Sequence, residues 1–94
     1  MDISTQNNKD RKLKAYSIRD IKATIFIPPY YNPNDQVAIR TFSDILQNPH
    51  AAISKHPEDY QLHHVGFFNE ETGVLEGCPV SHVIDASTLL NQLT

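Results

Sequence analysis

One segment, residues 32–49 (NPNDQVAIRTFSDILQNP), has the pattern of an amphipathic helix and constrains the fold more than any other part of the chain. Asn32 is suited to cap such a helix, Pro33 to its first position, and the helix must stop before Pro49. Apolar side chains then share one side of it: Val37, Ala38, Phe42, Ile45 and Leu46. A single apolar stripe needs a sheet to cover. We therefore expect one main helix, over about residues 33–47, packed on one face of a sheet.

The segments around this helix have the alternation typical of strands. Residues 12–20 (KLKAYSIRD) place Tyr16 and Ile18 on one face, and residues 21–29 (IKATIFIPP) read as a half-buried strand that two prolines end. Residues 61–77 (QLHHVGFFNEETGVLEG) predict a β-hairpin with a short second strand. The tail predicts a short strand over His82–Ile84, then a closing helix with leucines at helical spacing. The order of elements indicates an α+β fold with a small antiparallel sheet of four to five strands.

The length of 94 residues is enough for one compact domain. We expect residues 9–94 to form a single α+β domain, and residues 1–8 (MDISTQNN), which lack periodicity, to be a disordered leader. No apolar run approaches the length of a membrane span, and the start lacks the apolar core of a signal peptide. The protein is therefore expected to stay in the compartment where it is made, without a membrane partner.

Motifs that carry chemistry are absent from the sequence. The lone cysteine, Cys78, excludes an internal disulfide and fits a reducing cytoplasm, and its neighbours Gly77 and Pro79 suggest a turn. His63 and His64 are neighbours on a predicted strand, so they point to opposite faces and cannot chelate one ion together. There is no nucleophile elbow and no glycine-rich phosphate loop. We expect a non-catalytic protein with no metal site and no cofactor.

Charge is distributed unevenly along the chain. Residues 1–22 hold six basic and three acidic side chains, net +3, whereas residues 23–94 hold two basic and eight acidic ones, net −6. A local basic patch can steer a polyanion even though the whole chain has a net charge of −3. Two tyrosines, Tyr30 and Tyr31, follow the second predicted strand (PPYYN). Cationic side chains beside exposed rings are typical of proteins that bind single-stranded nucleic acid.

The alternative for these tyrosines is structural. Tyr30 and Tyr31 would then fasten the end of the strand to the start of the helix, with Tyr16 and Phe26 in the core. The residues alone leave both readings open.

Several stretches together resemble the small non-structural protein of gokushoviruses, which are single-stranded DNA bacteriophages of the microvirus group. They are KAYSIRD, KATIFIPPYY, AIRTFSDILQNP and HPEDYQLHHVGFFNEETG, which run from Lys14 to Gly73. The resemblance implies a non-capsid phage protein, described as DNA-binding, that acts when replication turns to making and packaging single strands. It supplies no functional residue to carry over. The leader before Lys9 and the tail after Gly77 depart from the family pattern.

The leading hypothesis is therefore a phage accessory protein of the host bacterial cytoplasm that binds single-stranded DNA, as a homo-oligomer because so small a domain covers few nucleotides. The phosphate and base contacts are predicted at nine positions: Lys9, Arg11, Lys12, Lys14, Tyr16, Arg19, Lys22, Tyr30 and Tyr31. Convergence of Lys12, Lys14, Arg19, Tyr30 and Tyr31 on one exposed face would favour this hypothesis, whereas scattered positions would favour a protein-interaction adaptor. The alternative is an adaptor that docks on the phage replication initiator, the capsid or a host replication protein through its acidic remainder.

Overall fold

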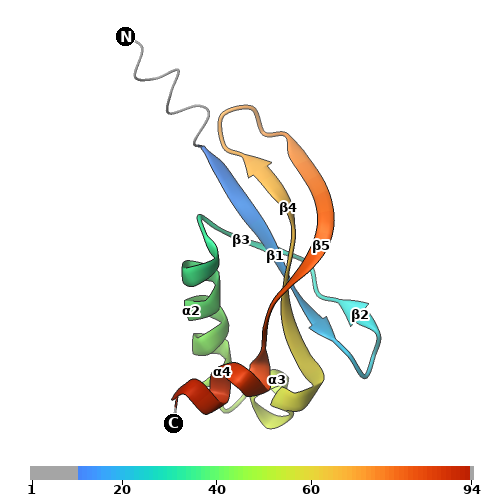
Figure 1. The fold of residues 1–94 in the computed structure, drawn as a ribbon, viewed down its shortest axis with the longest axis vertical. Helices are drawn as coiled ribbons and strands as arrows, with labels where there is room; N and C mark the ends of the chain where they lie inside the picture. Colours follow the sequence, from blue (N-terminus) through green and yellow to red (C-terminus); the bar gives the residue numbers. More distant parts are fainter. Residues whose placement is uncertain (1–10, 94) are drawn as a thin grey trace.

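A computed structural model describes residues 11–93. Lys9 and the predicted leader lie outside these residues. The chain forms a five-stranded antiparallel sheet with helices against one of its faces, which confirms the expected α+β architecture (Figure 1). The sheet follows the order β2-β1-β4-β5, and β3 also pairs with β1. The strands are β1 (Lys12–Asp20), β2 (Ile25–Phe26), β3 (Tyr30–Asn32), β4 (Tyr60–Asn69) and β5 (Leu75–Asp85).

The helices gather on one side of the sheet and at its lower end in Figure 1. They are α2 (Asp35–Leu46), α3 (Ala52–Lys55), the 3-10 turn η1 (Pro57–Asp59) and α4 (Ala86–Leu93). Their apolar side chains meet Tyr16, Ile18 and Leu62 of the sheet in one core. The helical members of this core are Ala38, Phe42, Leu46, Ile53, Ala86 and Leu89. The predicted stripe of the main helix thus covers the sheet, and the predicted closing helix is also present. No helix within residues 11–93 has the length and apolar character to cross a membrane.

The main helix begins later than the sequence suggested. Its cap is Asn34, whose side chain accepts a hydrogen bond from the Val37 amide at 3.0 Å. Asn32 instead ends β3, where it pairs with Lys14 of β1, and Pro33 precedes the helix. The predicted cap at Asn32 is therefore wrong, because Asn32 is part of a strand and cannot also begin the helix.

The predicted half-buried strand over residues 21–29 is also wrong. Residues 21–24 form a turn, in which the Asp20 carboxylate accepts a hydrogen bond from the Ala23 amide and Thr24 adopts a φ of 58°. Only Ile25 and Phe26 then pair with β1, and both are exposed. Alternating apolar residues can predict an extended chain, but they do not guarantee that a second layer covers it.

The second half of the hairpin is longer than expected. β5 runs without interruption from Leu75 to Asp85, so Gly77, Cys78 and Pro79 lie inside a strand and not in a turn. A shift of register opposite Val65, between the pairs His64↔Ser81 and Gly66↔Gly77, accommodates them. The polar connection before β4 likewise contains α3 and η1, which the sequence did not predict.

Candidate nucleic-acid interface

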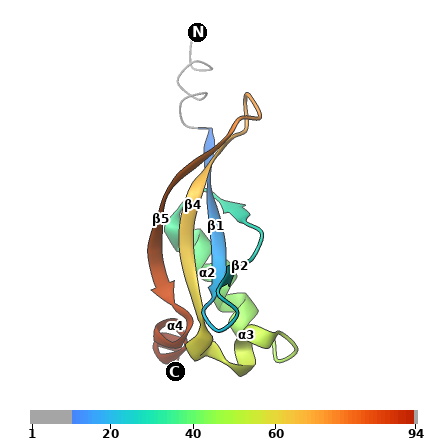
Figure 2. The same ribbon diagram turned by 90° about the vertical axis from the view of Figure 1, so that its right-hand side faces the viewer.

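The sheet has one face that α2 does not cover, and we call it the open face. Figure 2 looks onto this face, with α2 behind the strands. Tyr16 and Ile18 of β1 point toward the helices, so their neighbours Ser17 and Arg19 point to the open face. His63 lies opposite Ser17 and Gln61 opposite Arg19 in the register of β1 and β4. Within residues 11–93 no enclosed pocket is present, so a ligand of this face would lie on its surface.

Rings stand in two groups on the open face. In the first, the centroids of Tyr31 and Phe68 are 5.6 Å apart. In the second, His63 meets Phe26 edge-on at 5.4 Å and His82 at 5.5 Å. Between these groups β1 carries only small side chains, Ala15 and Ser17, both buried. Tyr31 and Phe26 remain 37% and 43% exposed, so both groups offer ring surface to solvent.

Arg19 lies beside the second ring group. Its guanidinium carbon is 5.4 Å from the centroid of Phe26, a distance at which a cation is attracted to the face of a ring. Within the described residues Arg19 forms no ion pair, and its Nε is buried without a hydrogen-bond partner. A half-buried guanidinium without a carboxylate is a group that an anion could satisfy.

A chain of hydrogen bonds links His63 to Gln61, Asp85 and His82. His63 Nε2 lies 3.1 Å from the Gln61 side-chain oxygen, and the Gln61 amide nitrogen donates to Asp85 at 3.0 Å. The same Asp85 oxygen lies 2.7 Å from Nε2 of His82. His63 Nδ1 is buried without a partner. Burial lowers the pKa of His63, the positive groups His82 and Arg19 lower it further, and Asp85 acts in the opposite direction.

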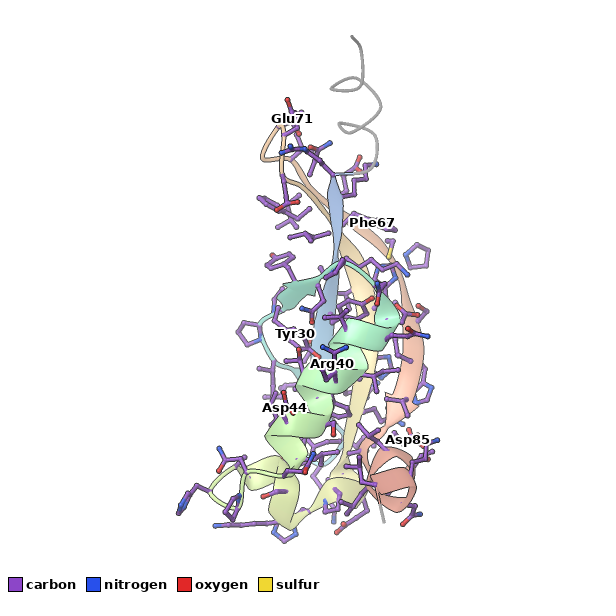
Figure 3. All side chains as sticks on the ribbon, turned by 90° about the vertical axis from the view of Figure 1, so that its left-hand side faces the viewer. Tyr30, Arg40, Asp44, Phe67, Glu71 and Asp85 are labelled. Carbon is purple, nitrogen blue, oxygen red and sulfur yellow. The ribbon has the colours of Figure 1, made fainter. Side chains whose placement is uncertain are left out.

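Two of the predicted stacking rings lie on the other side of the sheet. Tyr16 is fully buried and donates a hydrogen bond to Asp35, so its prediction as a stacking residue is wrong. Tyr30 packs against the core and donates to the Ala38 carbonyl at 3.0 Å, and burial raises its pKa to about 12. The structural alternative therefore describes Tyr30, which Figure 3 shows on the helix side. Tyr31, its neighbour, points to the open face.

The predicted basic residues do not gather in one place. Lys14 binds Asp35 at 3.2 Å on the helix side, and Lys12 lies 3.9 Å from Glu76. Arg11 lies 3.9 Å from Glu71 near the tip of the hairpin. Lys22 is exposed in the turn after β1. Among the predicted residues that the structure describes, only Arg19 and Tyr31 lie on the open face, so the expected convergence is absent there.

The sequence did not reveal four members of the open face. Phe26, Phe68, His63 and His82 come from three strands, and only the strand register brings them beside Arg19 and Tyr31. Alternation along residues 12–20 was the one available signal, since it puts Arg19 on the face opposite Ile18.

His64 behaves as the alternation along the strand predicted. His64 points to the side opposite His63, where its ring meets Tyr16 at 5.6 Å. Its Nε2 lies 2.9 Å from the Gly66 carbonyl, and its Nδ1 is 3.7 Å from the Cys78 sulfur. These contacts hold the irregular part of the hairpin together.

Ligand-type atoms of three residues lie within 4.8 Å of one another at η1, in His56, Glu58 and Asp59. His56 and Glu58 are exposed, and such polar groups often gather on surfaces without an ion. We assign no metal to them.

The fold and the open face together define a small α+β protein whose sheet is covered by helices on one face and carries rings on the other, beside an arginine that forms no ion pair within residues 11–93. In comparisons with known proteins, the family described as Phage ORF5 protein matches residues 13–89. The chain belongs to this phage protein family. No curated protein and no solved structure matches it.

Proposed function

We propose that this phage protein is a non-structural accessory protein of a gokushovirus that binds single-stranded DNA without catalysis, in the cytoplasm of the bacterial host. The observation that carries the proposal is the open face, where two ring groups flank small residues and Arg19 has no counter-ion within residues 11–93. Membership of a phage family and the resemblance to gokushovirus proteins support the same role.

The chemistry of the open face suits an extended single strand. Bases can stack on rings whatever their sequence, and each stacked base contributes roughly 1–3 kcal/mol. Tyr31 with Phe68 and Phe26 with His63 supply two such platforms on one antiparallel sheet. Arg19 and, in the adjoining turn, Lys22 supply positive charge for phosphates. The site proposed here thus keeps Arg19, Lys22 and Tyr31 of the predicted set and replaces the remainder.

Fluorescence anisotropy with a labelled oligo(dT) at low salt tests this proposal. Tyr31→Ala and Phe26→Ala should each weaken binding, by roughly 5- to 150-fold if one stacked base is lost. Phe67→Ala is the matched control, because Phe67 packs near Lys12 and His64 on the helix side of β4 (Figure 3). The absence of binding by the unaltered protein, or an equal loss in all three variants, would contradict the proposal.

An adaptor function is the second candidate, and one observation favours it. The basic side chains of β1 are scattered, and Lys12 and Lys14 already face carboxylates. Exposed apolar side chains on β2 and its flanks, among them Ile25 at 54%, could instead contact a protein. Co-elution with the purified replication initiator or coat protein of the same phage, unaffected by oligonucleotide or by Tyr31→Ala, would favour the adaptor.

We also propose that the protein acts as a homo-oligomer. β5 is an edge strand of 11 residues, and its part after Pro79 (VSHVID) lacks the lysines, arginines and prolines that often block edge pairing. Two copies related by a twofold axis can pair such edges antiparallel. Light scattering after size-exclusion chromatography should give the molar mass of a dimer. Val80→Lys should lower this mass toward that of a monomer. Val74→Lys is the control, because Val74 is similarly exposed but precedes the strand.

A further inference from the structure

Arg19 differs from the other described basic residues of β1. Lys12 and Lys14 face carboxylates at 3.9 and 3.2 Å, whereas Arg19 forms no ion pair within residues 11–93. Its guanidinium rests over Phe26, and only Nε is buried without a partner, so the terminal nitrogens can reach a ligand. A planar guanidinium stacked on a ring is already oriented and matches the oxygens of a phosphate in a bidentate manner. Its position and chemistry therefore suit phosphate.

Two imidazoles on the same face can add positive charge, His63 near Arg19 and His82 against His63. His63 is only 9% exposed, and its Nδ1 has no partner. Because the Gln61 amide nitrogen donates to Asp85, the Gln61 oxygen is left to accept from His63 Nε2. Neutral His63 therefore carries its proton on Nε2, and a second proton must go to the unpaired Nδ1. His82 stands against His63 at 5.5 Å and is itself held by Asp85.

We propose that Arg19, His63 and His82 form a phosphate subsite of the open face, in which a DNA phosphate binds to the Arg19 guanidinium and is taken up together with a proton on the two imidazoles. This inference rests on the proposed function and specifies how the same face recognises its ligand. It adds a dependence on pH that stacking alone does not produce.

The groups around His63 explain the coupling to a proton. Arg19 on β1 and His82 on β5 oppose protonation of His63, and Asp85 on β5 favours it; the β2 neighbour, Phe26, and Gln61 are uncharged. A phosphate bound to Arg19 neutralises the main fixed positive charge, and its own negative charge favours an imidazolium. The pKa of His63 therefore rises when phosphate binds, and by linkage the phosphate binds more tightly when His63 is protonated.

The phosphate can be the terminal group of a strand or an internal phosphodiester, because both offer the same oxygens. Three labelled oligo(dT) strands distinguish them: one with a 5′-phosphate, one with a 3′-phosphate and one with neither. Tighter binding of one phosphorylated strand indicates a terminal phosphate, and equal binding of all three indicates an internal one. The pH and Arg19 dependence below is expected in either case.

The test measures affinity at pH 6 and pH 8 at constant ionic strength. The unaltered protein should bind about three- to tenfold more tightly at pH 6. The upper limit corresponds to a rise of one unit in the pKa of one imidazole when the phosphate binds. Arg19→Gln should lose most of this pH dependence and bind about tenfold more weakly at pH 6, as expected for a lost charged hydrogen bond. Arg40→Gln is the matched control, because Arg40 is an exposed arginine on α2, on the opposite side (Figure 3).

Histidine variants separate the subsite from the general charge of the protein. Replacing His63 and His82 together by Gln should remove the pH dependence, whereas His50→Gln, in an exposed connection, should preserve it. Arg19→Lys keeps the charge without the planar fork and should bind with intermediate affinity. Melting curves of each variant establish that the affinities come from folded protein.

The possible failures are distinguishable. If the unaltered protein binds no oligonucleotide at either pH, the proposed function itself fails, and this inference with it. If it binds oligonucleotide, but the folded variants Arg19→Gln and Arg19→Lys bind as tightly as the unaltered protein, the subsite alone is overturned. Displacement of oligonucleotide by polyglutamate at equal concentration would also overturn it, since it would indicate an acidic protein partner.

Discussion

At the residue scale, neighbouring side chains on one strand lie on opposite faces of the sheet and have different surroundings. Tyr30 faces the core and donates to the Ala38 carbonyl, whereas Tyr31 faces solvent and meets Phe68. Their sequence context (PPYYN) treats them alike, so residue type alone could not assign either role. The same holds for Tyr16, which is buried and whose hydroxyl donates to the half-exposed carboxylate of Asp35. An aromatic residue becomes a candidate for base stacking only when the fold is known to leave it uncovered.

The Tyr16 hydroxyl should stabilise the protein in a pH-dependent way. It is the main cause of the lowered pKa of Asp35, with Lys14 as a further cause. A lowered carboxyl pKa stabilises the fold above the unfolded value, about 3.9, and this stabilisation is lost as the pH falls through the folded pKa. We expect Tyr16→Phe to reduce the free energy of unfolding by about 1–2 kcal/mol at pH 7. The difference from the unaltered protein should narrow toward pH 2–3, as measured by urea unfolding.

Tyr30→Phe provides the control for this prediction. Its hydroxyl donates to a neutral carbonyl, so its loss should cost a similar free energy that does not change between pH 7 and pH 3. Equal pH dependence of the two variants would exclude a special role for the Tyr16–Asp35 bond.

At the element scale, the irregular part of the hairpin depends on a glycine. A Cβ on Gly66 would lie 2.4 Å from the Glu76 carbonyl oxygen, which is backbone and cannot rotate away. Gly77 is its partner in the register, and a Cβ there would meet nothing within 4 Å. Gly66→Ala should therefore lower the free energy of unfolding by about 1–3 kcal/mol, as overpacking does. Thermal and urea unfolding measure the loss.

Gly77→Ala is the natural control, because it changes the same residue type directly across the ladder. We expect its free energy of unfolding to stay within about 0.5 kcal/mol of the unaltered value. If Gly77→Ala lowers the free energy of unfolding as much as Gly66→Ala does, any side chain near the bulge destabilises the hairpin. The close approach of the two strands at Gly66 would then not be the cause.

The elements differ in how far the sequence could predict them. The main helix was predictable because its apolar period, and the proline that ends it, are local properties of residues 33–49. β1 and β4 were predictable for the same reason. The continuous β5 was not, since Gly77 and Pro79 are common strand breakers and only the bulge opposite Val65 makes room for them. The open face depends on strand pairing between residues distant in sequence, such as Arg19↔Gln61, and this register cannot be predicted from local sequence patterns.

At the scale of the whole molecule, the charge asymmetry of the sequence does not become one basic surface. The described basic residues of the first segment are distributed over the hairpin tip, the helix side, the open face and the turn after β1. Arg11, Lys12 and Lys14 also face Glu71, Glu76 and Asp35. The acidic remainder of the chain thus neutralises much of the patch within the fold. Binding by charge alone would be weak, and stacking must supply a large share of the affinity.

This distribution predicts a shallow salt dependence of DNA binding. Contacts to two phosphates, by Arg19 and Lys22, give a slope of log affinity against log salt of about −1.4 for a single strand, whereas all six basic residues of the segment would give about −4. Anisotropy titrations over a tenfold range of NaCl measure the slope. Lys22→Gln should make it shallower by about 0.7, and Arg40→Gln should leave it unchanged. A slope near −4 would show that the first segment contacts DNA as a whole, and the open face would then lose its place as the main binding surface.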